Sequence, residues 1–122
     1  MMRCLQWMAA LAGCVLSSTP ALAQDYPTRA VKIVVPFTAG SATDILARTI
    51  GQKLSESWGQ PVVVENRPGA GGTIGAALVA KSPADGYTLM AHSAAQAVNA
   101  SMYPSLPYDT LKDFVQVVPL AG

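Results

Sequence analysis

The sequence predicts an α/β fold in which a parallel β-sheet is flanked by helices. Residues 30–35 are a nearly continuous β-branched run, which is typical of a buried parallel strand, and Pro36 ends it. Apolar residues then recur every four positions over 43–58, which indicates an amphipathic helix, and a second apolar run follows at 62–65. Because strands alternate with helices, we expect parallel pairing through right-handed crossovers.

The helix expected over 43–58 has recognisable ends. Ser41 or Thr43 can cap its N-terminus, and Asp44 in the first turn suits the helix dipole. Gly59 closes the helix, and Pro61 prevents it from resuming. Its apolar stripe is expected to consist of Ile45, Leu46, Ile50, Leu54 and Trp58.

The remaining elements are predicted from turn residues and composition. In chain order they are a glycine-rich loop at 66–72, a small-residue helix at 73–82, a turn at 83–86, a strand at 87–91, a short helix at 96–102 and a strand at 114–120.

The first 23 residues predict a signal peptide. A short positive start precedes a mostly apolar run, and Ala21-Leu22-Ala23 fits the small-x-small cleavage rule. We expect cleavage after Ala23 and a periplasmic location, with 24–122 as the mature part and no membrane span in it. The segment ending at Cys14 resembles a lipoprotein box, but the residues before it are few and a good cleavage site follows. Simple export is therefore favoured, and both cysteines then leave with the signal.

Composition excludes several classes of protein. Charged residues are only 12 % of the chain and apolar residues 51 %, which favours a packed core over a disordered tail. The net charge is +1 and there is no basic run, so we expect no nucleic-acid binding.

No residue set predicts catalysis, a metal or a cofactor. The glycines at 69 and 71 fit the first two positions of a dinucleotide fingerprint, but Ile74 occupies the third, so this segment is interpreted as a structural loop or the rim of a site. Neither Ser41 nor Ser93 lies in a nucleophile elbow. His92 is the only histidine, and no cluster of His, Cys and carboxylates indicates a metal.

Two turns are the candidate site. Each follows a predicted strand, so a parallel sheet would open both at the same edge, where small anions meet backbone N–H groups. An ordinary β-α turn and helix capping by Ser93 are the simpler interpretations. The charge of Asp44 argues against a nearby anion, unless its side chain points aside or holds the loop through hydrogen bonds. The candidate ligand-binding residues are Phe37, Thr38, Gly40, Ser41, Thr43 and Asp44 in the first turn, and His92, Ser93 and Asn99 in the second.

Residues 26–122 resemble the opening of the Bug (TctC-type) periplasmic solute receptors of tripartite tricarboxylate transporters. The resemblance lies in four sequence segments: VKIVVPFTAGSATDILAR, LSESWGQPVVVENRPGAGGTIGA, KSPADGYTLM and LPYDTLKDF. The resemblance implies the parallel-sheet domain of a type II periplasmic binding protein clamshell, which captures small carboxylates for inner-membrane transporter subunits. In that family the two turns at 37–44 and 92–99 hold the carboxylates, largely through backbone groups and water.

The chain also departs from the family pattern. Ser41 stands where the family usually has a second glycine, and 93–96 reads Ser-Ala-Ala-Gln instead of Ser-Gly-Thr-His. Such receptors are two domains of ordinary size, roughly 300 residues in all. We therefore expect 24–122 to be the first part of domain 1, without the second domain or the returning segment, and to be marginal or aggregation-prone by itself. A small α/β enzyme and a stand-alone periplasmic ligand-sequestering domain are the alternatives.

Overall fold

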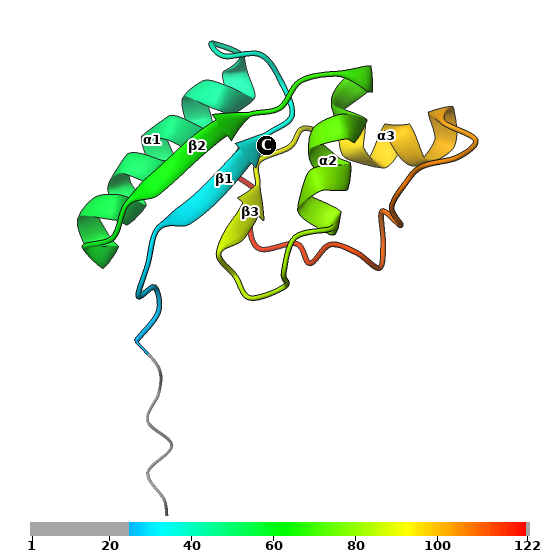
Figure 1. Ribbon diagram of the computed structural model, residues 1–122. Coiled ribbons are helices and arrows are strands. Elements are labelled where there is room, and N and C mark those ends of the chain that lie inside the picture. The colour runs from blue at the N-terminus through cyan, green and yellow to red at the C-terminus, as the bar shows by residue number, and fades with distance from the viewer. Residues whose placement is uncertain (1–24, 122) are drawn as a thin grey trace, which may run out of the picture.

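The computed structural model describes residues 25–121, which form one small α/β unit (Figure 1). The predicted element order from the first strand to the last helix is confirmed, with bounds that shift by two residues or fewer. The elements are β1 (Val31–Val35), α1 (Ala42–Trp58), β2 (Val62–Asn66), the short 3-10 turn η1 (Ala70–Gly72), α2 (Thr73–Ala80), β3 (Thr88–Met90) and α3 (Ala95–Met102).

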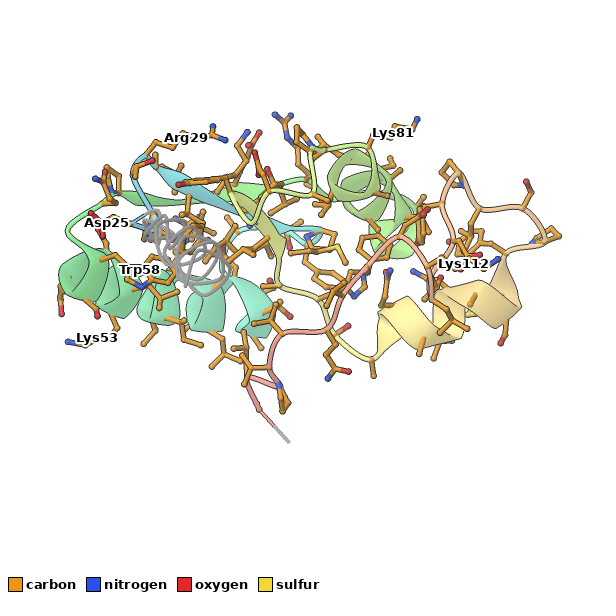
Figure 2. The ribbon with its side chains drawn as sticks, turned by 90° about the horizontal axis from the view of Figure 1, so that it is seen from below. Asp25, Arg29, Lys53, Trp58, Lys81 and Lys112 are labelled. Carbon is orange, nitrogen blue, oxygen red and sulfur yellow. The ribbon has the colours of Figure 1, made fainter. Side chains whose placement is uncertain are left out.

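The sheet is parallel throughout and has the order β2-β1-β3. The central strand β1 aligns Val31 with Val62 of β2 and Ile33 with Leu89 of β3. Helix α1 packs against β1 and β2, whereas α2 packs against β1 and β3. Figure 2 shows these two helices on opposite faces of the sheet. The chain therefore reaches the two sides of β1 by crossovers over different faces, which is the doubly wound arrangement.

The core between α1 and the sheet is built from small residues on the helix and β-branched residues on the strands. Ala47 is buried against Ile33 and Val35. Gly51 lies so close to β2 that a Cβ placed on it would be 3.3 Å from Cγ1 of Val62. The small side chains let the helix backbone approach the sheet, so the large side chains of the sheet can fill the space between them.

The apolar stripe expected on α1 is only partly correct. Ile50, Leu54 and Trp58 are half-buried, but Ile45 is 57 % exposed and Leu46 is also exposed. The buried positions of the helix are Asp44, Ala47 and Gly51. The four-residue spacing therefore identified the helix, whereas the close approach to the sheet decided which face is buried.

The strand expected over 114–120 is wrong, because this segment is irregular. Figure 1 shows it running back from the end of α3 toward the sheet. A strand needs a neighbour for its ladder, and no residue from 25 to 121 pairs with this segment. Its β-branched side chains are consequently open to solvent, with Val115 89 % and Val117 79 % exposed.

An aromatic cluster fixes the beginning of the described chain. The ring of Tyr26 packs edge-on against Trp58 at the end of α1 and against Tyr87, the residue before β3. Its hydroxyl donates to the carbonyl of Gly86. Arg29 lies over the ring of Tyr87 and forms an ion pair with Asp85. The residues ahead of β1 are thus tied to the end of α1 and to the turn before β3.

The predicted signal peptide, its cleavage after Ala23 and the alternative at Cys14 lie outside the described residues. Within 25–121, none of the helices combines the length and the apolar character that crossing a bilayer requires.

Candidate functional site

The candidate site lies at the edge of the sheet where all three strands end. In Figure 1 the arrowheads of β1, β2 and β3 point to the same side of the molecule, and the segments that follow them lie together there. The first turn, residues 37–41, leads into α1; the second turn, residues 91–94, leads into α3; and the glycine loop, residues 69–72, leads into α2. The carboxyl edge of a parallel sheet is the usual place for ligands in open α/β folds.

The first turn is closed by the cap of α1. Ser41 is the N-cap residue, and its hydroxyl accepts the N–H of Asp44 at 3.3 Å. The N–H of Ser41 in turn donates to the carbonyl of Thr38 at 3.2 Å. Gly40 has a φ of +84°, a conformation that favours glycine. The predicted cap at Ser41 is therefore confirmed, and Thr43 lies inside the helix.

The carboxylate of Asp44 is buried and is directed into the protein. It is 2 % exposed and accepts hydrogen bonds from the N–H of Gly40 at 2.9 Å, from Nε of Arg48 at 3.1 Å and from Nδ2 of Asn66 at 2.9 Å. These bonds, led by the one from Arg48, lower the pKa of Asp44 to about 2. The interpretation in which Asp44 holds the loop through hydrogen bonds is the one that the structure shows.

This network decides which backbone donors of the first turn remain available. The N–H groups of Gly40 and Ser41 are used internally. Within the described part of the chain, the N–H groups of Ala42 and Thr43 at the start of α1 have no protein acceptor. Since Asp44 is paired with Arg48, its charge is offset beside these two donors. The start of α1, directly after the first turn, can therefore donate two hydrogen bonds from uncharged groups to an anion.

The second turn is organised around His92 and Ser93. Nδ1 of His92 accepts the N–H of Ser93 at 2.9 Å, and the hydroxyl of Ser93 accepts the N–H of Ala95 at 3.3 Å. Burial lowers the pKa of His92 and so favours the neutral form of the ring. The hydroxyl of Ser93 thus contacts the first residue of α3, but the N-cap residue of this helix is Ala94, and no side chain caps it, so the capping interpretation of Ser93 is wrong. The proton of the Ser93 hydroxyl can still be donated. Ser93 itself is exposed.

His92 joins the second turn to the other two segments. Its imidazole meets the ring of Phe37 with centroids 5.1 Å apart. On its other side, Nε2 is buried close to Gly72, where an added Cβ would come within 2.7 Å of it. A side chain at position 72 would therefore collide with the imidazole. The glycine loop, interpreted from sequence as a structural loop or a site rim, lies against the second turn.

Asn99 faces the glycine loop. Its side chain is 4 % exposed, and Nδ2 donates to the carbonyl of Gly71 at 2.9 Å. This bond ties α3 to the glycine loop, so the amide of Asn99 supports the site from behind. Direct contact between Asn99 and a ligand stays a prediction.

The nine predicted residues thus fall into three groups. Phe37 and His92 come together across the two turns. Asp44 and Asn99 are buried and are used in internal hydrogen bonds. The other five residues lie at the surface or are half-buried along the two turns: Thr38, Gly40, Ser41, Thr43 and Ser93.

Asn66 and the contacts of the glycine loop were missed from the sequence. Asn66 ends β2, and its amide bonds Phe37, Asp44 and Arg48. A polar residue directly after the second predicted strand was the available signal. In the segment 25–121, no group of three or more His, Cys, Asp and Glu side chains is placed to share a metal.

Comparison with known proteins adds to this geometry. A family described as "Tripartite tricarboxylate transporter family receptor" matches residues 46–122. Protein BugT of Bordetella pertussis is 50 % identical over 102 residues, which cover 82 % of this chain and 31 % of that protein. The chain spans about a third of the length of the curated relatives that it matches.

Two solved structures have a similar fold. MatC from Rhodopseudomonas palustris, with bound malate, is 41 % identical and superposes with a TM-score of 0.67, over 73 % of this chain and 31 % of that one. An R. palustris protein solved with adipate is 57 % identical with a TM-score of 0.53, over 54 % of this chain and 22 % of that one. The identities and the superpositions agree with the parallel α/β fold described above.

Proposed function

This chain belongs to the tripartite tricarboxylate transporter receptor family. We propose that it serves as a periplasmic solute receptor that captures small organic anions. The ligand class is carboxylates, by analogy with the malate-bound and adipate-bound relatives. The receptor delivers its ligand to the inner-membrane subunits of a tripartite tricarboxylate-type transporter. In this role the chain binds and releases a ligand without chemical change, and it is not an enzyme.

The observation that carries the proposal is the convergence of the two turns. The contact between Phe37 and His92 brings the turn after β1 beside the turn after β3. The N–H groups of Ala42 and Thr43 and the hydroxyl of Ser93 then offer neutral donors at one edge of the sheet. Several hydrogen bonds from uncharged donors can hold a carboxylate without an ion pair and still release it, as a receptor that passes on its ligand requires.

Calorimetric titration with malate and with adipate tests the proposal. We expect binding by the full chain and weaker binding by two variants, Ser93→Ala and Gly40→Val. The first removes a donor, and the second places a branched side chain at a positive φ. One lost hydrogen bond corresponds to about 0.5–1.5 kcal/mol, or roughly 2- to 10-fold in affinity.

Ser105→Ala is the matched control, since Ser105 is an exposed serine outside both turns. Failure of the full chain to bind either dicarboxylate would argue against the ligand class. Wild-type affinity in both variants would instead remove these turns from the site.

A further inference from the structure

We propose that Asn66 is a positioning residue of the ligand site, whose side-chain amide keeps the first turn in its receptive shape. The inference rests on the proposed function, because it assigns a role within the same site. Asn66 lies behind the first turn and is half-buried, so its effect passes through the turn and not through contact with the ligand.

Every hydrogen-bonding atom of this amide is used. Nδ2 donates to the carbonyl of Phe37 at 3.1 Å and to Oδ1 of Asp44 at 2.9 Å, and Oδ1 accepts from Nη2 of Arg48 at 2.9 Å. The backbone of Asn66 is itself held in the sheet, in register with Val35. The amide is therefore a rigid link between the end of β2 and the start of α1.

Apart from the bond between Ser41 and Thr38 and the contact of Phe37 with His92, this network is what holds the first turn. Thr38, Ala39 and Gly40 are exposed, so apolar packing does not fix their backbone. Gly40 is instead held by its bond to Oδ2 of Asp44, while Asn66 holds Oδ1 of the same carboxylate. The shape of the turn thus depends on a chain of bonds that runs from the sheet through Asn66 and Asp44 to Gly40.

The amide must also be neutral. A carboxylate at position 66 would stand within hydrogen-bond distance of Asp44, and like charges at that distance disfavour each other. Arg48 of α1 is the cation that both groups share. The other charged neighbours are already paired, since Glu65 binds both Lys32 and Arg67.

Three variants of the full chain test the role. Asn66→Ala removes the amide, Asn66→Asp replaces it by a carboxylate, and Gln60→Glu adds the same charge ahead of β2 as a control. The first readout is hydrogen exchange of the Gly40 amide, compared with amides in β1. The second is the affinity for malate, measured at pH 7 and at about pH 4.5, each relative to the unaltered chain at the same pH.

At pH 7 we expect Asn66→Ala and Asn66→Asp to speed Gly40 exchange and weaken malate binding about tenfold or more, while β1 amides keep their protection. At the lower pH Asn66→Asp should recover part of both losses, because a protonated carboxyl can donate to Asp44 and accept from Arg48. Asn66→Ala should not recover. Such pH-dependent rescue would not follow from a general loss of stability.

Unchanged Gly40 exchange in both Asn66 variants overturns the positioning role. Faster exchange in β1 by the same factor as at Gly40, without recovery of Asn66→Asp at the lower pH, also overturns it. If the unaltered chain binds no malate, the proposed ligand class fails, and Gly40 exchange alone decides whether Asn66 positions the turn. The two failures are therefore distinguishable.

Discussion

The ring of Phe37 and the imidazole of His92 meet edge-on, with their planes inclined by 69°. Phe37 follows β1 and His92 follows β3, so this contact exists because these two strands are neighbours in the sheet. Aromatic pairs of this geometry contribute about 0.5–1.5 kcal/mol beyond their buried area. The pair is well placed to keep the two turns at a fixed separation, and a ligand that spans both turns would depend on that separation.

His92 predicts a stability change near neutral pH. Because burial lowers the pKa of this imidazole below 6.5, the unfolded chain binds a proton more readily than the folded chain. Stability should therefore be full above about pH 7 and decline as the pH falls through 6.5. Urea unfolding between pH 8 and pH 5 measures this decline. His92→Asn, which keeps an acceptor for the N–H of Ser93, should remove it; an equal pH slope in both proteins would contradict the prediction.

The lowered pKa of Asp44 leads us to expect a second decline in stability, at acid pH. Its folded pKa of about 2 lies below the ordinary value of 3.8, so its contribution is complete above pH 3.8 and is lost as the pH falls toward 2. Asp44→Asn should lower the Tm at pH 7 by at least several degrees, because the charge-assisted bonds from Arg48 and Gly40 are lost. It should also flatten the acid dependence of the Tm. Asp25→Asn, at an exposed position outside this network, serves as the control.

The absence of a side chain at Gly51 allows the close packing of α1 on the sheet, so we expect a larger residue there to destabilise the fold. Gly51→Leu should destabilise the fold by about 1–3 kcal/mol, because the new side chain meets Val62 and Val64 and the helix must shift away. Chemical denaturation of this variant beside Gln52→Leu, at an exposed position on the same helix, measures the difference. Equal stability of the two variants would show that the helix can move at no cost.

The exposed apolar side chains of residues 111–118 lead us to expect poor solubility. Val115 and Val117 are almost fully exposed, and Leu111 and Val118 add to the exposed apolar surface. Val115→Lys combined with Val117→Lys should raise the concentration at which the chain stays monomeric and leave the free energy of unfolding within about 0.5 kcal/mol of the original. Light scattering and urea unfolding provide the two readouts. Aggregation at the same concentration in both proteins would show that these exposed valines do not cause it.

The secondary structure was largely predictable because its signals are local. The β-branched run of β1, the four-residue spacing of α1 and the left-handed glycine that closes α1 at Gly59 each act within a few residues of the chain. The strand expected over 114–120 fails for the complementary reason. Its residues have strand propensity, but a strand also needs a partner, and no partner lies within the described residues.

The candidate site was predictable as a place but not as a set of contacts. Parallel pairing puts the ends of β1 and β3 at one edge, and that inference needs only the order of the elements. The role of Asn66 depends on β2 lying beside β1, which brings its amide to Asp44 across 22 residues of sequence. The burial of Asn99 likewise depends on a contact with Gly71 made 28 residues away.

The sequence by itself determined the α/β class, the positions of β1, β2 and β3 and of α1, α2 and α3, a helix cap at Ser41 or Thr43, and the resemblance to a receptor family. These follow from periodicity, from helix capping and from short sequence motifs, which are properties of residues close together in the chain. Only the tertiary structure decided that α1 buries Ala47 and Gly51 instead of Ile45 and Leu46, that Asp44 points inward, and that His92 meets Phe37 and the glycine loop. These features arise from close packing and from pairing of buried polar groups, which depend on residues that are distant in the chain.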